Sequence, residues 1–242
     1  MSSAISPSPL PRTMPEIVVA SNRGRWKEKI AIIGGGPAGL SCAYYLACMG
    51  YYPTVFEKNE EPGGMLRYGI PSYKLEKKVI EAEIDIMREI GVEIRTGVEV
   101  GKDISLDELR AEGYKGFYVA IGCQGGRLPG IEGDRLEGTT TAIEFLHKAN
   151  CGQLRLEGKV VVVGGGNVAI DAARVAMRSG AESVKMLSLE SEDIMPATPF
   201  ARKFLRRTEK PRGIFTMSAT ESACFHSAEV LVRSALTRRW RI

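Results

Sequence analysis

The 242-residue sequence has few of the side chains on which metal binding and nucleophilic catalysis depend. It contains two histidines, which lie far apart, and five cysteines, none of which form a Cys-x-x-Cys pair. They are His147, His226, Cys42, Cys48, Cys123, Cys151 and Cys224. A disulfide redox centre and a run of iron–sulfur ligands both need closely spaced cysteines, so both are excluded. Scattered thiols in odd number are typical of a reducing compartment, and we expect a cytoplasmic protein without a metal site.

Long apolar runs and a strong overall charge are also absent. No stretch approaches the roughly 18 consecutive apolar residues of a membrane span, so we expect no membrane partner. The formal net charge is +4, but residues 201–242 alone hold ten Lys/Arg against three Asp/Glu. The rest of the chain is slightly acidic and has no basic patch of the kind that binds nucleic acid. We therefore expect no nucleic-acid partner.

The first 28 residues show no hydrophobic period and begin rich in Ser and Pro. Such a composition predicts a disordered arm over residues 1–28. The first 15 residues contain one Arg and no acidic residue, which keeps organellar targeting as an alternative to the cytoplasm.

Short apolar strands alternate with helices along most of the remaining chain. Strands are expected at 30–33, 54–57, 91–100, 116–121, 159–163 and 183–189. Helices are expected at 38–49, 77–90 and 139–151 and from the second glycine turn to residue 179, with a short one opened by a Ser105–Glu108 capping box. This alternation predicts an α/β fold with parallel strands. Residues 197–242 lack the alternation, although a helix with poor apolar spacing is an option at 219–236.

A glycine-rich turn after the first strand carries the clearest functional signal. Residues 34–39 read Gly-Gly-Gly-Pro-Ala-Gly and open the helix that follows. Gly34 permits the tight turn, Gly36 lets the backbone approach a pyrophosphate, and Gly39 lets helix and strand pack closely. The helix N-terminus offers unpaired N–H groups to the phosphates. Glu57 ends the next strand, where a carboxylate can bind ribose hydroxyls. The alternative is an ordinary glycine turn.

A second turn of the same kind follows about 130 residues later, at residues 164–169. The three fingerprint positions are held by Gly164, Gly166 and Ala169. Glu190 follows the next strand, where a carboxylate would bind the 2′-hydroxyl of NAD and repel the 2′-phosphate of NADP. A structural glycine turn is again the alternative, and Asp171 is interpreted as a helix-surface or packing residue. Two such turns predict two Rossmann-like dinucleotide-binding units.

Between the two turns, residues 62–71 read Pro-Gly-Gly-Met-Leu-Arg-Tyr-Gly-Ile-Pro. Paired glycines after a ribose-binding strand let the backbone pass close to a flat ring. From the residues alone, a plain loop is an equal alternative.

Several strings together resemble the small (β) subunit family of glutamate synthase. They are residues 31–41, 63–71, 97–101, 120–122, 164–171 and 195–197. The string at 63–71 is highly specific, and the resemblance covers about two thirds of the chain. Members of that family are flavoproteins that pass electrons from NAD(P)H through FAD to an iron–sulfur partner.

The resemblance implies two groups of cofactor-binding residues and no separate catalytic residue. The FAD group comprises Gly34, Gly36, Pro37, Ala38 and Gly39 at the pyrophosphate, Glu57 at the ribose, Gly64, Met65, Leu66 and Arg67 along the flavin, Val98 at the adenine, and Gly122 where the chain leaves the FAD domain. The nicotinamide group comprises Gly164, Gly165, Gly166, Asn167, Val168 and Ala169, to which Glu190 is added from its position.

The resemblance also implies a division into domains. We expect the FAD-binding domain at 29–135, the first half of an NAD(P)-binding domain at 136–196, and a divergent basic tail at 197–242. Family members return after the NAD(P) domain to a second FAD segment with a Gly-Asp motif, which the tail does not resemble. The flavoprotein-reductase fold is therefore expected to be truncated, or incomplete, at the C-terminus.

Two departures from the family pattern concern individual residues. Leu189-Glu190 stands where many members have an Arg-Arg pair that suits NADP, which favours NADH. Lys74-Leu75-Glu76-Lys77 stands where an Arg-Leu-Pro-Lys string is common.

The function predicted is an FAD-dependent oxidoreductase that passes hydride from NAD(P)H to FAD and electrons onward. The partner expected is an electron-accepting subunit or an iron–sulfur protein. One alternative is a truncated pseudo-enzyme that binds a nucleotide or a partner without turnover, motivated by the missing return segment. Another is a dihydropyrimidine-dehydrogenase-like FAD/NADPH module, against which Glu190 and the absent downstream domains count.

Overall fold

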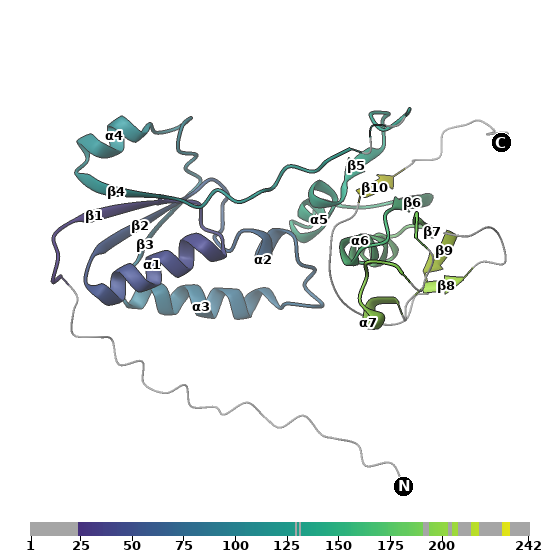
Figure 1. Cartoon of the computed structure of the whole chain (residues 1–242), viewed down its shortest axis with the longest axis horizontal. Helices are drawn as coiled ribbons and strands as arrows, with labels where there is room; N and C mark the ends of the chain where they lie inside the picture. Colours follow the sequence, from purple (N-terminus) through teal and green to yellow (C-terminus); the bar gives the residue numbers. More distant parts are fainter. Residues whose placement is uncertain are drawn as a thin grey trace, which may run out of the picture.

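The computed structural model describes residues 24–128, 130, 132–190, 194–202, 205–207, 214–217 and 229–232. These residues form two α/β lobes placed end to end along the long axis of the molecule (Figure 1). The first lobe is residues 24–128, and the second is the described part of residues 132–232. The arm expected at 1–28 lies outside the described residues as far as residue 23.

The first lobe is built on a four-stranded parallel sheet in the order β3-β2-β1-β4. Its strands are β1 (Lys29–Ile33), β2 (Tyr52–Glu57), β3 (Glu93–Thr96) and β4 (Tyr114–Val119). Its helices are α1 (Pro37–Met49), α2 (Met65–Tyr68), α3 (Lys77–Glu89) and α4 (Leu106–Ala111). Helices α1 and α3 lie on one face of the sheet, and α4 covers the other (Figure 1).

Alternation along the strands explains this arrangement, because successive side chains of a strand point to opposite faces. Ile32 and Val55 pack toward α1. Their neighbours Ala31 and Phe56 pack toward Leu109 of α4. The parallel strands are thus buried on both faces, as expected for a doubly wound unit.

The second lobe is built on a six-stranded sheet in the order β5-β10-β6-β7-β9-β8. Its strands are β5 (Thr139–Thr141), β6 (Lys159–Val163), β7 (Ser183–Leu187), β8 (Leu205–Arg207), β9 (Ile214–Met217) and β10 (Glu229–Val232). Its helices are α5 (Ala142–Asn150), α6 (Asn167–Arg178) and α7 (Pro199–Arg202). The β6–β7 pair is parallel, and the other pairs are antiparallel. Helix α6 is the centre of this core, and Ile170, Ala172 and Ala173 on it are fully buried.

The α/β fold class with two Rossmann-like units is confirmed. The helices expected at 38–49 and 77–90 and the Ser105–Glu108 capping box are also confirmed. Three expectations about elements are wrong. Residues 139–141 are a strand and not the first turn of a helix; the strand expected at 91–100 is shorter, Glu93–Thr96; and residues 197–242 do contain strands.

The first and third of these corrections share a physical cause, which is pairing between strands distant in sequence. Strand β10 lies between β5 and β6, and β9 lies beside β7. The helix considered at 219–236 is contradicted at Glu229–Val232, which form β10, and its other residues lie outside the described part. Local periodicity carries no information about such partners.

Among the described residues, no helix has both the length and the apolar character required to cross a lipid bilayer.

Candidate functional site

The first glycine turn leaves β1 and begins α1. Gly34 has φ +110°, and a Cβ there would lie 2.3 Å from the carbonyl oxygen of Ala120. A Cβ on Gly39 would lie 1.9 Å from the carbonyl oxygen of Gly34. Gly36 is different, because the nearest described atom to its Cβ position is Cα of Gly64, at 3.9 Å. Gly34 and Gly39 are therefore required by the fold, whereas Gly36 keeps a space open beside the start of the helix.

Glu57 at the end of β2 is buried and held in one orientation. Its Oε2 accepts a hydrogen bond of 2.7 Å from the amide of Gly35. Its Oε1 accepts two more from Asn59, from the amide at 2.9 Å and from Nδ2 at 2.6 Å. The carboxylate is thus fixed beside the glycine turn, as a ribose acceptor has to be.

A cavity of about 640 Å³ opens over this turn and over the strand ends. The predicted FAD residues that line it are Gly34, Gly36, Pro37, Ala38, Glu57, Gly64, Met65, Val98 and Gly122. Among the described lining residues, Lys58 is the one Lys or Arg, and sequence reasoning missed it. Its position directly after the strand-end carboxylate was the available signal.

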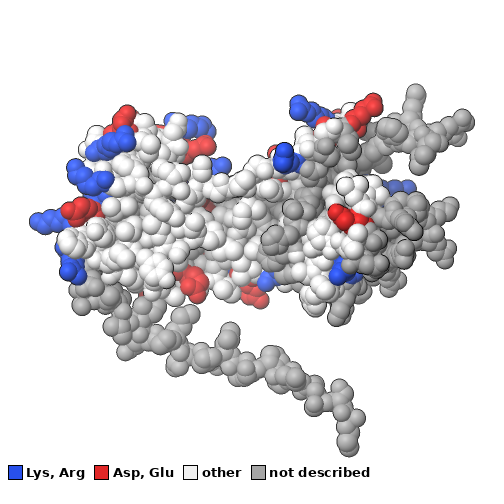
Figure 2. All heavy atoms as spheres, in the orientation of Figure 1, with Lys and Arg blue, Asp and Glu red and all other residues white. Residues whose placement is uncertain are grey.

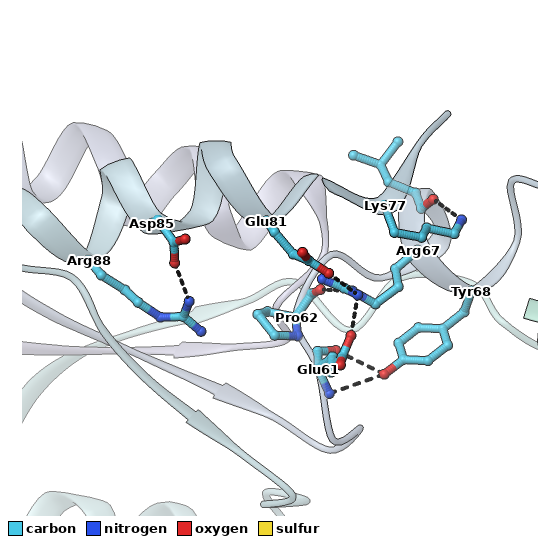
Figure 3. Close-up of polar contacts among 9 residues, drawn as sticks. Glu61, Pro62, Arg67, Tyr68, Lys77, Glu81, Asp85 and Arg88 are labelled. Carbon is cyan, nitrogen blue, oxygen red and sulfur yellow. Dashed lines mark hydrogen bonds and ion pairs between the residues drawn. The ribbon is translucent and has the colours of Figure 1, made fainter. Parts of the chain in front are cut away.

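The remaining three FAD residues of the prediction do not line this cavity in the described structure. Gly39 packs between helix and strand. Leu66 lines a second cavity, described below. Arg67 is buried within the 62–71 loop, where its Nε donates to the carbonyl of Pro62 at 2.9 Å. Figure 3 shows that its guanidinium is also paired with Glu61 and Glu81.

Arg67 and Lys77 together hold the 62–71 loop in shape. Nζ of Lys77 donates to the carbonyl oxygens of Leu66 at 3.2 Å and of Ile70 at 2.6 Å. Burial and the nearby Arg67 charge lower the pKa of Lys77 to about 8. The loop is joined to the first turn by the Gly63 amide, which donates to the carbonyl of Gly35 at 2.7 Å. The segment from the first glycine turn through α2 therefore forms one hydrogen-bonded unit.

The second glycine turn leaves β6 and begins α6 with the same geometry. Gly164 has φ +136°, and its amide donates to the carbonyl of Leu187 at 2.7 Å. A Cβ on Gly165 would lie 2.3 Å from Oγ of Ser188 and 3.1 Å from Oε2 of Glu190. Ser188 Oγ donates to Glu190 Oε2 at 2.7 Å. A carboxylate thus stands beside the middle glycine in both lobes.

The Met-Pro-Ala string at 195–197 is attached to this second turn. The amide of Ala197 donates to the carbonyl of Gly165 at 3.1 Å. The amide of Thr198 donates to Oδ1 of Asn167 at 2.9 Å, so the Asn167 side chain anchors the chain that follows. Asn167 and Ala169 are buried, and neither of them lines the cavity over the first turn or the one between the lobes. Sequence reasoning recorded the string but did not find this role.

A cavity of about 960 Å³ lies between the lobes. The predicted nicotinamide residues that line it are Gly164, Gly165, Gly166, Val168 and Glu190. The first lobe contributes Met65 and Leu66 to the same wall. Met65 and Gly125 line both cavities, so the two clefts meet at these residues. On the face shown in Figure 2 the surface between the lobes is mostly uncharged, which suits flat aromatic ligands.

Comparison with known proteins agrees with this geometry. The profile of the family described as pyridine nucleotide-disulphide oxidoreductase matches residues 28–232. The NADPH-Fe(3+) oxidoreductase subunit beta of Geobacter sulfurreducens is 44% identical over an alignment of 179 residues that covers 70% of this chain and 26% of that protein. The glutamate synthase [NADPH] small chain of Escherichia coli is 38% identical over an alignment of 184 residues that covers 71% of this chain and 39% of that protein. The resemblance to the glutamate synthase small subunit is thereby confirmed, and the chain spans between about a quarter and two fifths of these relatives.

A solved structure, FprA of Mycobacterium tuberculosis in complex with NADPH, superimposes with a TM-score of 0.59. It is 22% identical and covers 73% of this chain and 46% of FprA. At this identity the likeness concerns the fold.

Proposed function

This chain belongs to the pyridine nucleotide-disulphide oxidoreductase family, and from that membership we propose that it is an FAD-dependent NAD(P)H oxidoreductase module that passes electrons onward to a partner protein. The observation that carries the proposal is the contact between the two cavities at Met65 and Gly125. Electron passage inside one molecule requires two dinucleotide clefts that open into each other. The two cavities share the wall residues Met65 and Gly125 and are therefore adjacent, which supports such a passage.

FAD is assigned to the first cavity because the residues present suit it. The start of α1 offers the backbone N–H groups that bind a pyrophosphate, and the space over Gly36 leaves room for the close approach. Lys58 supplies a positive charge in the same cavity. Glu57 is oriented by Gly35 and Asn59 and has one lone pair left, on Oε2, for a ribose hydroxyl. When bound, FAD and the nicotinamide dinucleotide supply the hydride and electron transfer chemistry themselves.

The protein's own contribution is to position the two cofactors and to exclude water. Met65, Leu66 and Ile70 give the shared cavity an apolar wall on the side of the first lobe. Lys77 and Arg67 keep that wall in place by donating hydrogen bonds to backbone carbonyls of the 62–71 loop. An apolar, rigid wall limits access of water to the place where hydride would move.

The second cavity is assigned to a nicotinamide dinucleotide, with NADH favoured over NADPH. The support is Glu190, whose carboxylate stands beside Gly165, at the position that binds the 2′-hydroxyl in such folds. A carboxylate there repels a 2′-phosphate. Both relatives described above carry NADPH in their names, so this specificity is a feature that we propose for this chain in particular.

The partner proposed is a second polypeptide that accepts electrons, and an iron–sulfur protein is the specific form proposed. The naming of the relatives as a "subunit beta" and a "small chain" supports assembly with a second polypeptide. The iron–sulfur form of that partner comes from the family resemblance alone.

The test is to express the chain, add FAD, remove the excess and record the visible absorbance. We expect a yellow protein whose flavin band is bleached by NADH without oxygen. The Gly36→Ala variant is the matched control, because its methyl group fits the fold but fills the cleft, and it should remain colourless. A folded wild-type protein that takes up no FAD would refute the assignment of FAD. Bound flavin that neither NADH nor NADPH reduces would refute the electron route.

A further inference from the structure

Two adjacent side chains of the first lobe, Tyr73 and Lys74, reach across to α6 of the second lobe. They stand on the connection between α2 and α3, directly after the 62–71 loop. Tyr73 packs against the core cluster of the second lobe. The connection therefore belongs to the first lobe by sequence and to the second by its contacts.

The centre of this contact is Asp171 on α6. Lys74 Nζ donates to Asp171 Oδ2 in an ion pair whose two side chains are 3% and 4% exposed. The hydroxyl of Tyr73 donates to Oδ1 of the same carboxylate at 3.3 Å. Of the two sequence interpretations of Asp171, a packing residue is correct and a helix-surface residue is wrong, because the side chain is buried.

The Tyr73 ring is also held by two guanidinium groups. Those of Arg174 and Arg178 each lie 4.4 Å from the ring centroid, within cation–π range. Asp171, Arg174 and Arg178 follow one another at intervals of three and four residues, so they share one face of α6. A single helical face thus receives both side chains of the first lobe.

The electrostatics of the contact favour one fixed arrangement. Burial raises the pKa of Asp171, and the hydrogen bonds and charges of Lys74, Tyr73 and Arg174 act in the opposite direction. Burial and Asp171 raise the pKa of Tyr73, which keeps its hydroxyl protonated as a donor. A buried carboxylate that loses its cation is strongly destabilised. The lobes therefore cannot shift far without exposing or unpairing these charges.

The second lobe makes another contact with the same segment, at a point closer to the cavities. Nδ2 of Asn150 on α5 donates to the carbonyl of Tyr68 at 2.9 Å. The rings of Tyr68 and His147 are stacked, with centroids 4.8 Å apart. Residues 65–74 of the first lobe thus contact the second lobe at two places, Tyr68 and the pair Tyr73–Lys74. Met65, at the start of this segment, is the residue that lines both cavities.

We propose that Lys74, Tyr73 and Asp171 form an interlobe lock that sets the position of the two clefts relative to each other. Lys74 and Tyr73 are positioning residues, since they act by fixing where the wall of the shared cavity lies against the start of α6. Asp171, which holds both of them, also lines the shared cavity itself. The consequence for electron passage rests on the proposed function, whereas the lock itself does not.

The lock is tested by measuring the distance between the lobes without any cofactor. Nitroxide labels at Lys102→Cys in the first lobe and Glu182→Cys in the second, with the five native cysteines changed to alanine, report it by pulsed electron paramagnetic resonance. The parent chain should give one narrow distance distribution. Lys74→Met and Asp171→Asn should shift or broaden it. Lys74→Arg, which keeps the cation, should restore the narrow distribution. Lys78→Met, an exposed lysine for which the described structure shows no side-chain partner, is the matched control.

FAD affinity and flavin reduction give a second readout. Lys74 and Asp171 are not among the described residues that line the FAD cavity, so FAD fluorescence titrations should agree within about twofold across the set. Flavin reduction by saturating NADH should slow about tenfold or more in Lys74→Met, because small misplacements of reacting groups have large effects on rate. If Lys74→Met and Asp171→Asn do not fold, the distance between the lobes is measured in Tyr73→Phe, which removes only a hydroxyl.

Unchanged distance distributions in the folded Lys74→Met and Asp171→Asn variants would overturn the proposal, whatever their stability. A parent chain that binds no FAD would instead refute the proposed function and leave the distance measurement to decide the lock.

Discussion

Oε2 of Glu57 accepts a hydrogen bond of 2.7 Å from the amide of Gly35, which ties the end of β2 to the turn that begins α1. In the second lobe Glu190 stands beside Gly165 in the same way, but its carboxylate is held by the Ser188 hydroxyl. The two lobes thus repeat one arrangement, in which a glycine leaves room for a strand-end carboxylate. Each carboxylate is oriented by a different partner.

Replacing the first carboxylate should weaken binding of FAD. Glu57→Gln keeps the size of the side chain but loses the charge that strengthens hydrogen bonds from ribose hydroxyls. A loss of about 1.5–3 kcal/mol corresponds to an FAD affinity roughly 10- to 150-fold lower. Fluorescence titration with FAD measures it, with the exposed Glu60→Gln as the control. Equal affinities for the two variants would show that Glu57 does not contact the ligand.

Substitutions at two glycines of the first turn should have different effects, one on the stability of the fold and the other on binding of FAD. Gly34→Ala places a methyl group 2.3 Å from a backbone oxygen at φ +110°, so we expect a loss of at least about 2 kcal/mol in unfolding free energy. Gly36→Ala has ordinary contacts and φ −81°, so its stability should stay close to that of the parent. Urea unfolding measures both. A Gly36→Ala protein that is stable and still binds FAD would contradict the assignment of the cleft.

Charge at the second strand end should set the choice of dinucleotide. Glu190→Arg should weaken NADH and favour NADPH by about 1–3 kcal/mol, because an arginine attracts the 2′-phosphate that the carboxylate repels. Titration of the flavin-loaded chain with each dinucleotide gives the ratio of affinities. Glu182→Arg, an exposed position outside the cavity, is the control for a general charge effect. An unchanged ratio would place Glu190 away from the ribose.

Stability should depend on pH through Lys77. Its pKa is lowered to about 8 in the folded chain, below the ordinary value of 10.5, so the folded state loses this proton first. Between these values the unfolded chain binds more protons, and the free energy of unfolding rises with pH; below about pH 8 both states are protonated and this gain is absent.

The pH effect is measured by urea unfolding at about pH 7 and about pH 9.5 for the parent and for Lys77→Met. The parent should gain more stability than the variant over this interval. Equal changes in the two proteins would mean that the Lys77 pKa is not lowered on folding.

Features encoded by neighbouring residues were predictable. The turns at 34–39 and 164–169, the helix at 38–49 and the Ser105–Glu108 capping box each depend on contacts within one strand–turn–helix unit. Glycine at a positive φ and a side chain that caps its own helix have the same meaning in any fold. For this reason local sequence was sufficient.

Features made by distant residues were not predictable. Strand β10 exists because it pairs with β5 and β6, and the 195–197 string is held by Gly165 and Asn167. Arg67 appears in a flavin-side string, yet its guanidinium is committed to Pro62, Glu61 and Glu81. Nothing in the spacing of these residues shows which partner each one meets.

By itself, the sequence determined that this protein has two glycine turns that each open a helix after a strand, with a carboxylate at the end of the next strand. These follow from backbone sterics and helix polarity, which are local. Tertiary structure alone decided that the two clefts meet at Met65 and Gly125 and that Lys74 reaches Asp171 across the lobes. Burial of a charge depends on which surfaces come together, and that is settled only when the whole chain packs.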